Sequence, residues 1–125
     1  MLFRSTVDAS NPNFKGPSPA SEAETRAIQT FLLQVGKATL ILSYHRNLDW
    51  VAPSGPNAAT ARPLAQRYAQ LANHPYIYNN NGYGFFEAWY AAKTGTPALL
   101  VELSSSTQYS YLNRHADAVV GLLSP

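Results

Sequence analysis

Two apolar stretches, each ending in a residue that can do chemistry, decide the fold of this sequence. The first reads Thr-Leu-Ile-Leu-Ser-Tyr-His and ends at His45, and the second reads Pro-Ala-Leu-Leu-Val-Glu and ends at Glu102. Both are short, mostly apolar and preceded by a helical pattern, which is typical of buried parallel strands. In open α/β sheets, ligands bind beyond the carboxyl ends of the strands. A histidine and a glutamate at those ends therefore suggest a metal ligand and a general base.

Helical patterns surround these strands. The segment from Ser21 to Glu24 predicts a capping box with Ser21 as N-cap, and the helix that follows ends at Gly36. Further helices are predicted at about 61–72 and 85–93. The inward faces of the first helix and of a final helix are predicted to be formed by Ala27, Ile28, Phe31, Leu32 and Val35, and by Leu112, Ala116, Val119 and Leu123.

The alternation of helices and strands predicts an α/β fold with three layers, in which helices cover both faces of a mostly parallel sheet. Residues 1–20 read as an irregular lead-in, 46–60 as a loop and 75–78 as a short strand candidate. With 125 residues, the chain is expected to form a single domain over residues 1–125.

Composition excludes several classes of function. Charged residues make up only 13% of the chain, the net charge is +2, and the nine Lys and Arg are scattered, so we expect no nucleic-acid partner. No stretch is long enough to span a membrane, and the first five residues contain no signal-peptide core. The absence of cysteine excludes disulfides and thiolate metal sites but leaves the compartment open.

Four motifs in order resemble the C-terminal half of the zinc metallocarboxypeptidase catalytic domain, the carboxypeptidase A-like family. They are Gly-Pro-Ser-Pro-Ala-Ser-Glu-Ala-Glu-Thr-Arg-Ala (16–27), Ile-Leu-Ser-Tyr-His (41–45), Gly-Phe-Phe-Glu-Ala-Trp-Tyr (84–90) and Ala-Leu-Leu-Val-Glu-Leu (98–103). The resemblance implies a truncated version of that fold. The loop at 47–50 resembles bacterial branches that trim peptidoglycan peptides.

The resemblance also implies roles for individual residues. His45 would be the last zinc ligand, and Glu102 would be the catalytic base that takes a proton from the zinc-activated water. Tyr78 matches the substrate-closing tyrosine best, although Tyr83 competes for this role. Glu87 falls near the position that selects the side chain of the substrate, where a carboxylate favours a cationic or amine-bearing residue. Asn11 and Asn13 are expected to orient a substrate carboxylate.

The sequence departs from the family pattern in two places. It contains no His-x-x-Glu motif, which would supply the other two zinc ligands, and Pro12 stands where the family has an arginine that holds the oxyanion. Arg46 is a candidate for a substitute charge, and Asp49 or His74 for a rebuilt metal site.

Two functions from different classes follow. The first is a zinc-dependent carboxypeptidase-like hydrolase that removes C-terminal residues from peptides, with cell-wall peptides as one candidate substrate. The second is a non-catalytic relative that binds peptides or serves only as a scaffold. A half-size sheet also exposes an edge, so a second copy or a complementing chain is expected to cover it.

Overall fold

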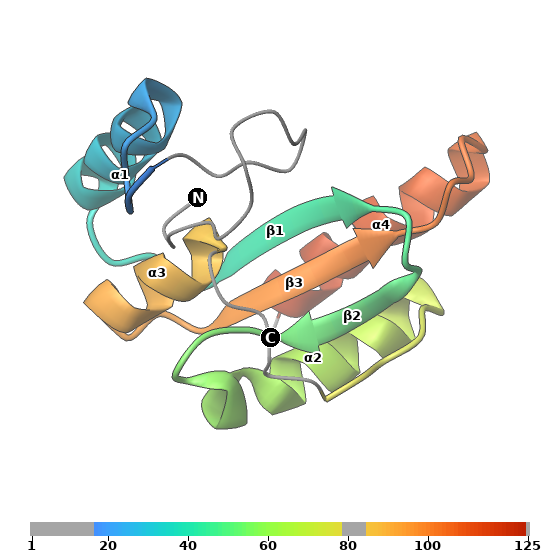
Figure 1. The fold of residues 1–125 in the computed structure, drawn as a ribbon. Coiled ribbons are helices and arrows are strands. Elements are labelled where there is room, and N and C mark those ends of the chain that lie inside the picture. The colour runs from blue at the N-terminus through green and yellow to red at the C-terminus, as the bar shows by residue number, and fades with distance from the viewer. Residues whose placement is uncertain (1–16, 79–84, 125) are drawn as a thin grey trace.

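A three-stranded mixed sheet forms the centre of the computed structural model, which describes residues 17–78 and 85–124 (Figure 1). The strands are β1 (Ile41–Arg46), β2 (Trp50–Pro53) and β3 (Ala98–Leu103), in the order β1-β3-β2. β1 runs parallel to β3, as the sequence predicts, and β2 runs antiparallel to it. β3 is apolar and almost completely buried because it has a strand on each side and helices on both faces.

Two long helices pack together on one face of the sheet. They are α2 (Ala58–Ala72) and α4 (Tyr109–Leu123), which contact each other extensively. Leu99 and Val101 of β3 point into this layer and, with small residues of α2 and with Ala118 of α4, form the hydrophobic core. The alanines of α2 allow the helix to approach the sheet closely, which explains why so much of this core is small side chains.

The other face of the sheet is covered by α3 (Phe86–Thr94), which contacts β1 and β3. The first helix, α1 (Ala23–Val35), lies beside α3 at the margin of the molecule (Figure 1). Tyr90 of α3 fixes the link between α1 and β1, because its hydroxyl donates to the Gly36 carbonyl and accepts from the Ala38 N–H. The prediction of an α/β fold with helices on both faces of the sheet is therefore confirmed, whereas the described sheet is mixed rather than mostly parallel.

The prediction of a loop over residues 46–60 is wrong, because it contains β2. A four-residue strand that ends in Pro53 gives almost no periodic signal in the sequence. Pro53 is tolerated because its nitrogen faces the outer edge of β2, two residues beyond the single bridge at Val51, where the strand needs no N–H donor. The strand candidate at 75–78 is reduced to a single bridge between Tyr76 and Val51.

The predicted start and inward face of the first helix are also wrong. Glu22, rather than Ser21, occupies the N-cap, and no side chain caps the helix. None of the residues of α1 is buried, and three apolar members of its predicted inward face are exposed: Ile28, Phe31 and Val35. The end of the helix at Gly36 agrees with the prediction.

The predicted inward face of the last helix is shifted by one position. Tyr111, His115 and Ala118 are the buried residues of α4, whereas Leu112 and Leu123 are exposed. The pattern misleads because a histidine and a tyrosine point inward, where they bond to other buried polar groups. The helices at α2 and α3 begin within three residues of their predicted starts.

No helix within the described residues is both long and apolar enough to cross a bilayer. Asn11, Pro12, Asn13 and Tyr83, for which the sequence implies roles, lie outside the described residues.

Candidate functional site

The strand register places His45 directly beside Glu102. The two residues are partners in the parallel pairing of β1 and β3, so their side chains leave the sheet on the same face. Phe85 and Glu87, at the start of α3, lie on this face too, and the His45 ring meets the Phe85 ring edge to face with 5.4 Å between centroids. The sequence prediction that two strands bring a histidine and a glutamate together at their carboxyl ends is confirmed.

The turn between β1 and β2 crosses the end of β3 and encloses this pair. Asn47 N–H donates to the Leu103 carbonyl at 3.0 Å, and Trp50 pairs with Glu102 on the other side. Asn47 and Asp49 adopt positive φ angles, which asparagine and aspartate tolerate better than most residues, so the chain turns sharply within three residues. The Glu102 residue is consequently only 7% exposed.

A second carboxylate is buried next to His45. Glu87 is fully buried, and its Oε1 accepts a hydrogen bond of 2.9 Å from the Ser54 hydroxyl. The His45 Nε2 lies 3.0 Å from the hydroxyl of Ser43, which stands two residues earlier on the same face of β1. Burial raises the pKa of Glu87, while the serine hydroxyls and the nearby His45 lower it by less.

Two carboxylate oxygens in this layer have no hydrogen-bond partner among residues 17–78 and 85–124. They are Glu87 Oε2 and Glu102 Oε2, and both are buried. A buried acceptor without a donor is costly, and such groups are rare away from functional sites. Both oxygens have the capacity to accept a hydrogen bond, but a ligand N–H would reach them only after the surrounding side chains move, because neither atom is exposed to solvent. This capacity of the site depends on acceptors, so it favours amine, ammonium or amide donors.

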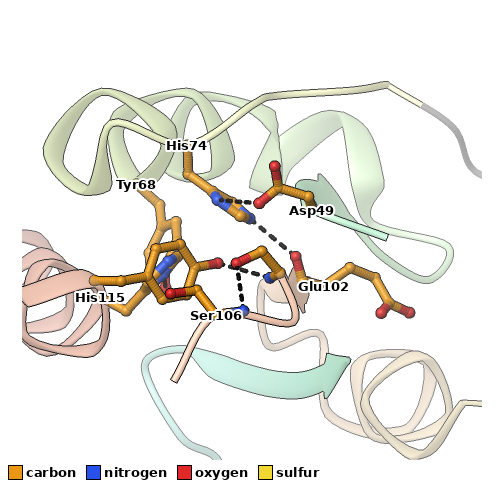
Figure 2. A network of polar contacts seen from close by, with 8 residues as sticks. Asp49, Tyr68, His74, Glu102, Ser106 and His115 are labelled. Atoms are coloured by element: carbon orange, nitrogen blue, oxygen red, sulfur yellow. Dashed lines mark hydrogen bonds and ion pairs between the residues drawn. The ribbon is translucent and has the colours of Figure 1, made fainter. Parts of the chain in front are cut away.

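A separate polar network lies on the opposite face of the same strand end (Figure 2). His74 Nε2 donates to the backbone carbonyl of Glu102 at 3.0 Å, and its Nδ1 lies 3.6 Å from the Asp49 carboxylate. The Glu102 side chain leads away from this network in Figure 2. The backbone of Glu102 is therefore bonded to His74 on the α2–α4 side, while its carboxylate lies on the α3 side.

The network continues into the layer between α2 and α4. The His115 ring packs against His74 at 4.7 Å between centroids, and its Nδ1 lies 2.6 Å from the Tyr68 hydroxyl. Burial, then the charges of His74 and Arg114, lower the pKa of His115 to about 4. His115 is thus neutral at physiological pH, and Tyr68, whose pKa burial raises, keeps its proton to donate to Nδ1.

Two other residues singled out in the sequence lie away from His45. Tyr78 is half exposed and lies under the guanidinium of Arg62 in α2, 5.0 Å from the ring centroid. Arg46 is the next residue after His45 on β1, so its side chain lies on the opposite face of the sheet. It donates to the Ser105 carbonyl at 3.1 Å, which argues against a role as the substitute charge beside His45.

Sequence reasoning missed the two buried serine hydroxyls that support the site, those of Ser43 and Ser54. Ser43 carried a usable signal, since a serine two positions before a strand-end histidine shares its face.

The donor set does not form a complete zinc site within the described ranges. No group of three or more His, Asp and Glu side chains there is arranged to hold a metal ion. His45 is the nitrogen donor on the α3 face, whereas His74 and Asp49 belong to the opposite face. A catalytic zinc in proteins usually takes three protein ligands. The described residues therefore do not fit a self-sufficient zinc centre, and the suggested rebuilt site with Asp49 or His74 is not formed.

The chain was compared with protein families, curated proteins and solved structures. No protein-family model matches the sequence. No curated protein matches it either. Among solved structures, the chain is similar to murein-tripeptide amidase MpaA from Escherichia coli O157, with a TM-score of 0.60 and 17% sequence identity over 98% of this chain. The chain spans about half of that protein, 49% of its length. At this identity the likeness is one of fold alone: this chain has an α/β fold similar to about half of that amidase.

Proposed function

We propose that this chain is a carboxypeptidase-like hydrolase domain that acts on the C-terminal end of peptides. The observation that carries the proposal is the direct pairing of His45 and Glu102 on adjacent parallel strands, with both side chains on the α3 face. Glu102 is proposed as the general base and His45 as a zinc ligand. Glu87 is proposed to select the substrate side chain, and Tyr78 to close over the substrate. Asn11 and Asn13 are proposed to orient the substrate carboxylate.

Zinc is the cofactor proposed for this activity, and His45 is the residue of the described site that would bind it. When bound, zinc would supply Lewis acidity and a water of lowered pKa. The remaining ligands must come from outside the described residues, which includes a second polypeptide. The name of the amidase with a similar fold makes a murein peptide the first substrate to try.

The experiment measures zinc stoichiometry after metal stripping and reconstitution, followed by hydrolysis of a free tripeptide and a murein tripeptide. About one zinc per chain, lost in His45→Gln but retained in Arg46→Gln, supports the proposal. Arg46 is the matched control because it is the next residue on β1 and faces away. Glu102→Gln should retain zinc and lose hydrolysis. Failure to bind zinc, or retention of zinc by His45→Gln, would falsify the assignment.

A non-catalytic peptide-binding function is the second candidate. It is favoured by the two buried carboxylate oxygens without partners, combined with the absence of a three-ligand metal group among the described residues. A peptide ammonium or amide N–H could satisfy these acceptors without any metal.

Binding of the same tripeptides by the metal-free chain separates this candidate from the first. Chemical-shift changes at β1, β3 and the start of α3, abolished in Glu87→Gln and Glu102→Gln together, support binding without catalysis. If neither zinc nor peptide binds, the chain is a scaffold and both candidates are wrong.

A further inference from the structure

A serine in the middle of β1 is buried in a mostly apolar strand. Ser43 is 2% exposed, and Leu42 and Tyr44 flank it in the sequence. A buried hydroxyl group without a hydrogen bond is destabilising, so this position requires a partner. One partner is His45, two residues later on the same face of the strand, whose Nε2 lies 3.0 Å from the Ser43 hydroxyl. One of the two ring nitrogens of His45 is therefore already in use.

Glu87 of α3 is a second partner of the Ser43 hydroxyl. Burial raises the pKa of the Glu87 carboxyl group, and hydrogen bonds from Ser54 and Ser43 are among the effects that lower it. The Ser54 hydroxyl donates to Oε1 at 2.9 Å, whereas Oε2 has no hydrogen-bond partner among residues 17–78 and 85–124. Ser43 thus lies between a buried carboxylate with unused accepting capacity and a histidine nitrogen.

The single proton of Ser43 determines how these groups are joined. A hydroxyl group has one proton and two lone pairs, an ionised carboxylate only accepts, and a neutral imidazole has one N–H and one unprotonated nitrogen. If Ser43 donates to His45, its lone pairs face the Glu87 carboxylate, and two acceptors meet without a proton between them. If Ser43 donates to Glu87, its oxygen accepts from the His45 Nε2–H, and each group has a partner. The second arrangement is favoured because the serine and the carboxylate are buried.

We propose that Ser43 and Glu87 are positioning residues that hold His45 in the Nε2–H tautomer, so that Nδ1 is the nitrogen available to a metal ion or another ligand. Protons are donated in one direction, from His45 to Ser43 and from Ser43 to Glu87. Partners of this kind fix the tautomer and ring orientation of metal-binding histidines in proteins. The inference rests on the proposed function only in taking His45 as a ligand-binding residue, because the hydrogen-bonded chain itself needs no metal.

Nitrogen NMR of the isotope-labelled, metal-free chain tests the proposal, because protonated and unprotonated ring nitrogens resonate far apart. The sequence contains three histidines, so each ring is assigned by a single His→Gln substitution. At a pH where His45 is neutral, the Nε2–H form of wild type should exceed the Nδ1–H form at least about tenfold, as one hydrogen bond of ordinary net strength gives. A wild type with the His45 proton on Nδ1 overturns the proposal.

Substitutions of the two positioning residues separate this role from simple packing. Ser43→Ala removes the acceptor for the His45 Nε2–H and should reduce the excess about threefold to tenfold, whereas Ser43→Thr keeps a hydroxyl group and should retain it. Glu87→Met removes the carboxylate at similar size. The Ser43 proton should then turn to His45 Nε2, and the Nδ1–H form should become the major one. An excess that is unchanged in Ser43→Ala or in Glu87→Met overturns the proposal.

The other two histidines are internal controls in the same spectra. His74 Nε2 donates to the Glu102 carbonyl, and His115 Nδ1 accepts from the Tyr68 hydroxyl. Their tautomers should be the same in wild type and in every variant, and a change at all three rings would show a general disturbance of the fold and contradict a specific role. The tautomer in wild type decides the proposal even where a variant does not fold.

The tautomer measurement and the zinc measurement fail independently. A proton on Nδ1 would refute the positioning role of Ser43 and Glu87 without touching the question of zinc binding. A chain that binds no zinc would refute the metal-binding role of His45, while an Nε2–H tautomer that depends on Ser43 would still establish the hydrogen-bonded chain.

Discussion

Acidification should destabilise this protein through one buried histidine, His115. His115 is only 4% exposed, and its ring lies against side chains from several elements. Tyr68 of α2 contacts its Nδ1, while His74 and Tyr111 pack against the ring. Its Nε2 is buried and has no hydrogen-bond partner in the described part of the chain. Protonation of Nδ1 would require the Tyr68 hydroxyl to change from donor to acceptor and to turn its own proton toward the Tyr44 hydroxyl, 3.2 Å away, while the new charge stays buried.

The magnitude follows from the pKa of His115, which falls from its ordinary value of 6.5 to about 4 in the folded protein. Burial is the largest cause, followed by the positive charges of His74 and Arg114, and Asp49 opposes them weakly. Each tenfold change in a protonation equilibrium corresponds to about 1.4 kcal/mol, so protonating the folded state costs about 3 kcal/mol more than protonating the unfolded chain.

The sign follows from proton uptake on unfolding. Between pH 6.5 and about pH 4 the unfolded chain binds a proton at this residue that the folded chain does not bind. The contribution of His115 to stability is therefore complete above pH 6.5 and is lost as the pH falls to about 4. Below that pH both states are protonated and the loss stops growing.

Urea unfolding of wild type and His115→Gln at several pH values between 7 and 4 measures this effect. The substitution has its own cost, which does not depend on pH, so the informative quantity is the change in the difference between the two proteins. That difference should shift by about 3 kcal/mol in favour of the variant from pH 7 to pH 4. A difference that stays constant within about 0.5 kcal/mol would refute the reasoning.

Three further substitutions test the packing and the buried carboxylate. Leu99→Ala should lower the free energy of unfolding by about 2–5 kcal/mol, because Leu99 is fully buried in the core, while Leu48→Ala, at a 63% exposed position, should cost under about 0.5 kcal/mol in the same urea assay. Gly55→Ala should cost about 2–4 kcal/mol, more than Gly95→Ala at about 1 kcal/mol. Both have positive φ, but only at Gly55 would a Cβ meet α3, at 3.1 Å. The stability of Glu87→Gln relative to wild type should increase as the pH rises above 4.5. Burial raises the pKa of Glu87, so the folded wild type holds this proton more tightly than the unfolded chain does, and losing it at higher pH destabilises the folded state.

The part of the fold that the sequence predicted is the part with strong periodicity. β1, β3 and α2 have long apolar runs or repeated small residues, and their positions agree with the structure. The inward faces of α1 and α4 were predicted wrongly for opposite reasons. α1 turns an apolar stripe to solvent, whereas α4 buries a tyrosine and a histidine that bond to other polar groups. Hydropathy alone distinguishes neither situation from an ordinary amphipathic helix.

The candidate site shows the same division between local and tertiary information. Because both strands end in a polar residue and parallel register aligns their ends, the meeting of His45 and Glu102 could be predicted from sequence. The burial of Glu87 against Ser54 could not, since the two residues are 33 positions apart and Ser54 follows an unpredicted strand. The same holds for the bond from His74 to the Glu102 carbonyl, which spans 28 positions.

Glu102 connects the two polar networks, and this has a physical consequence for the site. Its carbonyl accepts from His74 on the α2–α4 side, while its carboxylate lies beside His45 on the α3 side. In a strand, the backbone fixes the direction of the Cα–Cβ bond. The position of the Glu102 carboxylate therefore depends on the hydrogen bond from His74 to the Glu102 carbonyl. Asp49 contributes in two ways: its carboxylate lies 3.6 Å from His74 Nδ1, and its backbone is part of the turn that covers Glu102. The orientation of the proposed base is thus set by residues that no ligand on the α3 face would touch.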